Sequence, residues 1–162
     1  MDNGGAEARK GFNYQDAVIS LVCIRKYDSS NFRIYVEAND DFEVLMDDDF
    51  HAYIQVKGEK KLSIKKLLEQ RNGKKSILEK NFSYGDEKSK YKIVVFEFAQ
   101  SQLDRMAANL DEELFDKSLL LSVSQKEEVG NPKVERFSLV KTDFSKDLNV
   151  ARKYLKGEMI EK

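Results

Sequence analysis

The sequence contains very little cysteine, histidine, proline or tryptophan. Its 162 residues include one cysteine, Cys23, one histidine, His51, one proline and no tryptophan. A single cysteine excludes an internal disulfide and a cysteine-clustered zinc site, and a single histidine argues against a histidine-rich metal site or a Ser–His–Asp triad. If the chain is an enzyme, its chemistry must therefore come from carboxylates, amides and lysines.

Long apolar segments are also lacking. No apolar run approaches the roughly 20 residues that cross a bilayer, and the first residues form no basic and apolar signal segment. Because 35% of the residues are charged, we expect a cytoplasmic protein with no membrane contact. The length suits one domain, so we expect a loose lead-in over 1–10 and a single domain over 11–162. Whether this is the N-terminal fragment of a longer protein stays open.

The formal net charge of −1 conceals a strong segregation of charge along the chain. Residues 37–49 contain seven acids and no base, whereas residues 57–92 carry a surplus of seven positive charges. An acidic segment followed by a basic one is compatible with a cation site beside a surface that binds a polyanion. Charge alone, however, favours the plainer interpretation, the solvated faces of an acidic hairpin and a basic helix.

Hydrophobic periodicity divides the first half of the chain into a helix followed by three strands. Apolar residues surround most of the segment 11–25, which predicts a helix buried on several sides. Alternating or apolar runs bounded by turn residues predict strands over 32–37, 41–46 and 52–57, and the last two form a hairpin around Asp47–Asp49. Cys23 and Tyr14 are expected to pack in the core.

The second half is predicted to continue with alternating helices and strands. Ser63 is a plausible N-cap for a helix, and more helix is expected around 77–82. The apolar run within 90–98 suits a strand that is covered on both faces. Further expected elements are a helix over 101–117, a short strand over 118–124, a strand over 135–140 and a closing helix over 145–155. This order predicts an α/β sandwich, with a mixed central sheet that contains a three-strand meander and is flanked by helices.

A candidate site lies at the end of the predicted hairpin. Gln55 and Lys57 are two residues apart on one strand and therefore share a face, opposite Ile54 and Val56. Asp41 begins the partner strand, and Glu37 ends the strand before it. Carboxylate and amide oxygens suit Mg²⁺ or Mn²⁺. A lysine beside such a cation could stabilise a phosphoryl transition state or hold an attacking water, which is the logic of metal-dependent phosphodiester hydrolysis.

The same residues carry a family resemblance. Asp41 followed by Gln55-Val56-Lys57 resembles the core of PD-(D/E)xK nucleases, in the variant in which glutamine replaces the second acid. More narrowly, the segment 8–58 resembles the double-stranded-DNA endonuclease domain at the N-terminus of CBASS-type anti-phage effectors. The segments that carry this likeness are Ala8-Arg9-Lys10-Gly11-Phe12-Asn13-Tyr14-Gln15, Val36-Glu37, Asp40-Asp41 and Tyr53-Ile54-Gln55-Val56-Lys57.

The resemblance implies a restriction-endonuclease-like fold, a divalent metal and cleavage of duplex DNA with little sequence preference. It makes Asp41 the central metal ligand, Gln55 the second ligand, Lys57 the catalytic lysine and Glu37 an additional acid. Gln15 would reach toward the site from the first helix. The proline that names the superfamily is absent before Asp41, and an uncharged Gln55 favours one metal over two.

Each of these residues also has a structural interpretation. Asp41 could be a turn residue, Glu37 could pair with Arg33, and Gln55 and Lys57 could form an exposed strand face beside the acidic turn. Gln15 could be a satisfied core amide. His51 is expected to be exposed, and Asp111-Glu112-Glu113 is expected to be solvated surface. The lysines that could follow a DNA backbone, or simply confer solubility, are Lys60, Lys61, Lys65, Lys66, Lys74 and Lys75.

The leading hypothesis is therefore a Mg²⁺- or Mn²⁺-dependent deoxyribonuclease that acts on double-stranded DNA in anti-phage defence. Because an unregulated nuclease would harm its own cell, control by homo-oligomerisation or by a separate regulatory partner is expected. The alternatives are a module that grips nucleic acid or protein on a nuclease fold without cutting, and a ribonuclease.

Overall fold

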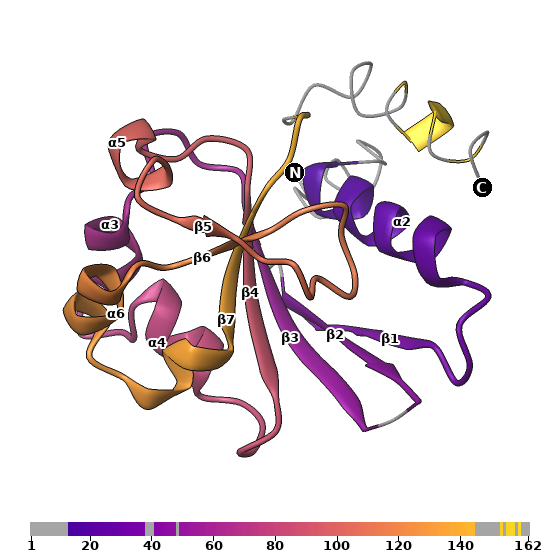
Figure 1. The fold of residues 1–162 in the computed structure, drawn as a ribbon, viewed down its shortest axis with the longest axis horizontal. Helices are drawn as coiled ribbons and strands as arrows, with labels where there is room; N and C mark the ends of the chain where they lie inside the picture. Colours follow the sequence, from indigo (N-terminus) through magenta and orange to yellow (C-terminus); the bar gives the residue numbers. More distant parts are fainter. Residues whose placement is uncertain are drawn as a thin grey trace, which may run out of the picture.

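The computed structural model describes residues 13–37, 41–47, 49–144, 153, 155–157 and 159, and these residues form a seven-stranded mixed sheet with helices on both faces (Figure 1). The sheet order is β1-β2-β3-β4-β7-β6-β5. The α/β sandwich with a mixed sheet is confirmed, and the architecture is restriction-endonuclease-like. The predicted lead-in over 1–10 and almost all of the predicted closing helix over 145–155 lie outside the described residues.

The first half of the chain forms the meander and the helix that covers it. Helix α2 (Tyr14–Lys26) is followed by β1 (Arg33–Val36), β2 (Asp41–Met46) and β3 (Phe50–Lys57), which pair antiparallel in sequence order. Helix α2 begins at Tyr14 because the Asn13 side chain accepts from the backbone N–H of Asp16, whose carboxylate accepts in turn from the N–H of Asn13. The three predicted strands and the first helix are confirmed.

The second half completes the sheet through parallel strands. Strand β3 pairs parallel with β4 (Lys90–Val95), and β4 pairs parallel with β7 (Phe137–Lys141). Between β3 and β4 the chain forms α3 (Ile64–Leu68) and α4 (Ile77–Phe82). Between β4 and β7 it forms α5 (Gln100–Leu103), β5 (Ala107–Ala108), β6 (Leu119–Leu120), α6 (Val123–Val129) and the 3₁₀ helix η1 (Pro132–Arg136). None of the helices in the described part of the chain is long and apolar enough to cross a membrane.

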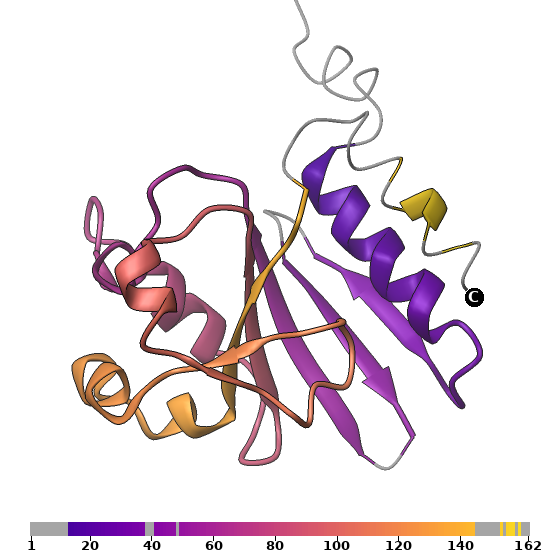
Figure 2. The ribbon, with the colours of Figure 1, turned by 45° about the horizontal axis from the view of Figure 1, so that its top comes forward.

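The sheet separates two hydrophobic cores. One lies between the sheet and α2, where Ala17, Val18 and Val22 pack with Phe42 and Ile54. The other lies on the opposite face, under α3 and α4, and includes Leu67, Leu78, Phe82, Tyr91 and Ile93. Figure 2, turned from the first view, again shows α2 on one side of the sheet and α3, α4, α5 and α6 on the other. Alternation along each strand therefore assigns each side chain to one of two different environments.

The predicted helix over 101–117 is wrong. Only α5 is helical there, and β5 and a loop over 109–118 follow it. A continuous helix would require Leu110 to face a core, but Leu110 is exposed. The predicted strand over 118–124 is also largely wrong, because β6 has only two residues and Ser122 caps α6 with its side chain and begins a helix at Val123.

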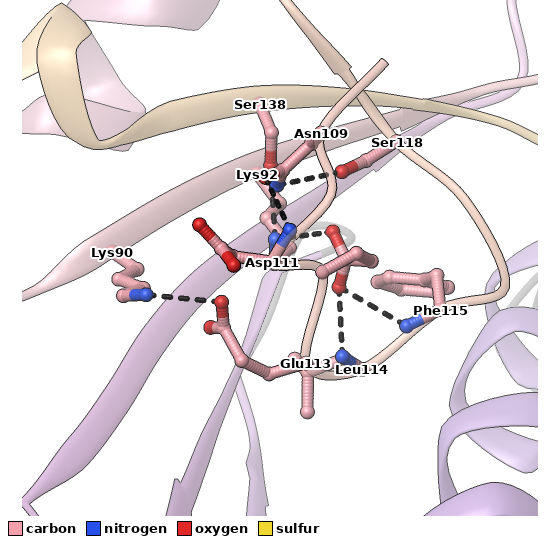
Figure 3. A network of polar contacts seen from close by, with 10 residues as sticks. Lys90, Lys92, Asn109, Asp111, Glu113, Leu114, Phe115, Ser118 and Ser138 are labelled. Atoms are coloured by element: carbon pink, nitrogen blue, oxygen red, sulfur yellow. Dashed lines mark hydrogen bonds and ion pairs between the residues drawn. The ribbon is translucent and has the colours of Figure 1, made fainter.

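The loop over 109–118 is fixed by a buried ion pair (Figure 3). Lys92 Nζ lies 2.6 Å from Glu112 Oε1 and donates to Ser138 Oγ at 2.9 Å. Glu112 Oε2 accepts from the N–H groups of Leu114 and Phe115 at 2.7 and 3.1 Å. The prediction that Glu112 belongs to a solvated surface is therefore wrong, since its side chain is 3% exposed.

Candidate functional site

Strands β2 and β3 bring Asp41 and Gln55 together at one end of the sheet. Asp41 is the direct cross-strand partner of Gln55, so their side chains leave the same face. Their neighbours Phe42 and Ile54 point to the other face, into the core under α2. Asp41 is 6% exposed and Gln55 1% exposed. The structure therefore confirms that the hairpin brings these two residues together.

A pocket of about 250 Å³ opens beside this pair. Glu37 contributes to its lining from the end of β1, and the backbone N–H of Glu37 donates to the Asp41 carbonyl at 2.9 Å. The remaining lining residues are Phe42, Glu43, Tyr53, Ile54, Asn81 and Tyr84. The structure thus places three of the predicted site residues, Glu37, Asp41 and Gln55, around one pocket.

Three buried polar atoms of this pair have no hydrogen-bond partner among the described residues. They are Asp41 Oδ1 and both polar atoms of the Gln55 amide. Because an unpaired buried polar group costs roughly 1–3 kcal/mol, such atoms indicate a missing ligand. A carboxylate oxygen and an amide oxygen fit a hard divalent cation. Within the described residues no three His, Cys, Asp or Glu side chains gather to hold a metal, so the amide is needed as a donor.

Lys57 lies two residues beyond Gln55 at the end of β3, on the same face of the sheet. It is half-buried, and within the described residues it has no hydrogen-bond or ion-pair partner. It is not part of the lining of the pocket. Alternation along β3 thus places Lys57 beyond Gln55 on the face that carries Asp41.

Gln15 is not brought into the pocket. It belongs to the first turn of α2, which packs on the opposite face of the sheet. That turn lies at the same end of the sheet as the pocket, because the Tyr14 hydroxyl lies 2.6 Å from Thr142 Oγ1, just after β7. Burial raises the pKa of Tyr14, which therefore stays neutral. Gln15 Nε2 is buried and has no hydrogen-bond partner in the described part of the chain, so Gln15 is not a satisfied core amide there.

Two residues of α4 belong to the site although the sequence did not indicate them. Lys80 Nζ lies 3.2 Å from Asp41 Oδ2, and Asn81 Nδ2 donates to the Tyr53 carbonyl at 3.2 Å. Asn81 is 1% exposed, and its Oδ1 has no partner among the described residues. The capping signal at Ser76 and Glu79 predicts a helix here, but no local pattern says that this helix reaches Asp41.

Aromatic rings form one wall of the pocket. Tyr84 stacks on Tyr53 with ring centroids 5.5 Å apart and an interplanar angle of 17°. Gly85 follows with φ +79°, and a Cβ atom there would lie 2.7 Å from the Tyr53 ring, so glycine is required for this approach. Burial and the nearby Glu43 carboxylate raise the pKa of Tyr53.

The prediction that His51 is exposed is wrong. His51 is half-buried and not exposed, and its Nε2 lies 3.0 Å from Glu43 Oε2. The ring also lies 4.5 Å from the Tyr53 ring, centroid to centroid. His51 therefore has structural partners within the hairpin, and it does not line the pocket of Asp41 and Gln55.

The predicted DNA-binding lysines are exposed and follow directly after β3. Lys60 and Lys61 precede α3, and Lys65 and Lys66 lie on it. Lys66 is 3.8 Å from Glu69 in an exposed ion pair. A second pocket of about 210 Å³ extends this basic surface; its basic lining residues are Lys66, Arg71, Lys74 and Lys75. The basic segment and the polar end of β3 are thus continuous along the chain.

Comparisons with known proteins agree with this geometry. Residues 3–117 match the family described as "Cap4, dsDNA endonuclease domain". The chain is 38% identical to the Lamassu protein LmuA of a Bacillus strain over 169 aligned positions, which cover 99% of this chain and 53% of that protein. It therefore spans about half the length of this curated relative. A solved Cap4 receptor with a SAVED/CARF domain from Moraxella osloensis shares the fold over 96% of this chain and 38% of its own, with a TM-score of 0.50 and 16% identity.

Proposed function

This chain belongs to the Cap4 dsDNA endonuclease domain family, and from this membership and the site we propose that it hydrolyses phosphodiester bonds of double-stranded DNA with Mg²⁺ or Mn²⁺. The observation that carries the proposal is the face shared by Asp41, Gln55 and Lys57. Among the described residues, the buried oxygens Asp41 Oδ1 and Gln55 Oε1 have no hydrogen-bond partner, and the Lys57 amine forms no hydrogen bond or ion pair.

In the proposed site, Asp41 and Gln55 would hold the cation through Oδ1 and Oε1, and Glu37 would add a carboxylate from the pocket rim. A bound cation would offset the charge that develops on the phosphoryl oxygens and lower the pKa of a bound water. Lys57 contributes a positive charge at the same place, where it stabilises the transition state or orients the attacking water. Gln15, outside the pocket, supports the site from the end of α2.

The exposed lysines extend the proposal to DNA binding. Lys60, Lys61, Lys65 and Lys66 carry charge without a fixed geometry for reading bases, which suits contact with the phosphate backbone and little sequence preference. Such binding weakens steeply as the salt concentration rises. The likeness to LmuA and to the Cap4 receptor supports a role in anti-phage defence. The proposal includes control of the nuclease activity by homo-oligomerisation or by a separate regulatory partner.

The test is plasmid cleavage by the whole chain with Mg²⁺ or Mn²⁺. Wild type is expected to nick and linearise the plasmid, whereas Asp41→Ala and Lys57→Ala each lose at least about a hundredfold in rate. Asp111→Asn is the matched control, because Asp111 is exposed and lies outside the site. Binding without cutting by wild type would favour a non-catalytic module, and preferential cleavage of an RNA of equal length would favour a ribonuclease.

A further inference from the structure

The two oxygens of the Asp41 carboxylate have different environments. Asp41 Oδ2 lies 3.2 Å from the ammonium group of Lys80, whereas Oδ1 is buried without a partner among the described residues. The adjacent Gln55 Oε1 is also unpartnered. One side of the carboxylate is thus already occupied by a positive charge, and the other side is left for a ligand.

Lys80 is held in this position by the residues around it. Leu78 and Phe82 of α4 are buried in the core under the helix. Asn81 fastens the helix to β3 through its hydrogen bond to the Tyr53 carbonyl. Because α4 is anchored on both sides of Lys80, the ammonium group stays within reach of Asp41. Its side chain is 35% exposed, so the lysine can be replaced without opening the core.

Resting on the proposed function, we propose that Lys80 takes the place of a second metal cation in this site. A carboxylate that binds two metal ions through separate oxygens needs both of them unoccupied. Here Lys80 holds Oδ2, and the neutral Gln55 adds no negative charge that could balance a second divalent ion. The chain therefore binds one divalent cation, with Asp41 Oδ1, Gln55 Oε1 and the Glu37 carboxylate as donors, and Lys80 acts as a positioning residue that limits its affinity.

The test is a titration of the whole chain with Mn²⁺ in the absence of DNA, in which electron paramagnetic resonance measures the free ion. Wild type is expected to bind one Mn²⁺ per chain. Lys80→Met removes the charge, keeps the aliphatic stem and lowers the dissociation constant about three- to tenfold, because the repulsion between two cations on one carboxylate is lost. Lys80→Arg restores the charge and is expected to bind Mn²⁺ as wild type does.

The control is Lys126→Met, because Lys126 forms a similar ion pair, 3.0 Å from Glu135, and neither residue lines the pocket of Asp41 and Gln55. It should leave Mn²⁺ binding unchanged. Two bound ions in wild type, or an unchanged or weaker affinity in Lys80→Met, would overturn the role of Lys80 alone. Absence of saturable binding in wild type, or equal binding by Asp41→Asn, would overturn the proposed metal site and the role of Lys80 with it.

Discussion

Two lysine–carboxylate pairs lie on opposite faces of the same sheet, and they differ in how completely their polar atoms are used. In the pair of Lys92 and Glu112, each charged group has at least two partners, and both side chains are almost completely buried (Figure 3). In the pair of Lys80 and Asp41, one carboxylate oxygen and both polar atoms of the adjacent Gln55 amide have no partner among the residues that the structure describes.

The difference separates a structural network from a candidate binding site. Desolvating a charge is unfavourable, and it is offset only when hydrogen bonds replace water. The loop over 109–118 supplies those bonds to Glu112 from its own backbone. No element in the described part of the chain supplies them to Asp41 Oδ1 or Gln55, so this part of the sheet retains unsatisfied polar groups that a ligand could use.

The largest expected effect on stability is in the buried pair. Lys92→Ala leaves Glu112 charged and unpaired in the core, and we expect it to lower the free energy of unfolding by about 3–5 kcal/mol. Lys80→Ala should cost less than about 1 kcal/mol, because Lys80 is partly solvated. Urea denaturation measures both. Equal losses in the two variants would contradict the distinction between the two pairs.

Replacing Gln55 is expected to raise the free energy of unfolding, whereas replacing Lys92 lowers it. Gln55→Leu removes a buried amide whose two polar atoms are unpartnered, and we expect it to raise the free energy of unfolding by about 1–2 kcal/mol while abolishing DNA cleavage. The matched control is Gln125→Leu. Gln125 is also 1% exposed, but it accepts from Ser122 N–H at 2.8 Å and donates to the Gln102 carbonyl at 3.0 Å. This variant should therefore lose stability.

The site is predictable from sequence where it depends on strand periodicity. A period of two and a short hairpin suffice to place Asp41, Gln55 and Lys57 on one face, and the structure has this register. Lys80 is not predictable in this way, because its approach to Asp41 depends on the path of the loop between α3 and α4. No local pattern in the sequence predicts the path of this loop.

The buried network was missed for a related reason. Glu112 lies between two other acids, a pattern typical of solvated surface, and the apolar residues of 101–117 resemble a helix. A signal was nevertheless present, because Lys92 directly precedes a run of apolar strand residues and a buried lysine requires a partner. Sequence could have indicated that a carboxylate was needed, but only the fold shows which one supplies it.

A smaller effect follows from acidification. Burial alone would raise the pKa of Glu112, but the charge of Lys92 and the hydrogen bonds from Lys92, Ser118 and Leu114 lower it below its usual value. The folded state therefore binds this proton less tightly than the unfolded state. The stabilisation is present above the pKa of an unfolded glutamate and is lost as the pH falls through the folded value. In Glu112→Gln, the free energy of unfolding measured with urea should fall less steeply between neutral and acid pH. The same pH dependence as in wild type would contradict this prediction.

The smallest effect is expected at the rim of the same network. Lys90 Nζ lies 3.0 Å from Glu113 Oε1, next to the buried pair in sequence, but these two side chains are 42% and 25% exposed. Both side chains are partly exposed, although Glu113 Oε2 is buried without a partner among the described residues, so Glu113→Gln should change the free energy of unfolding by less than about 0.5 kcal/mol. The buried pair and the rim pair have similar chemistry and geometry, and they differ chiefly in solvent access. A loss at Glu113 as large as that in Lys92→Ala would show that the whole loop over 109–118 unfolds as one unit, and burial alone would then not explain why Glu112 matters.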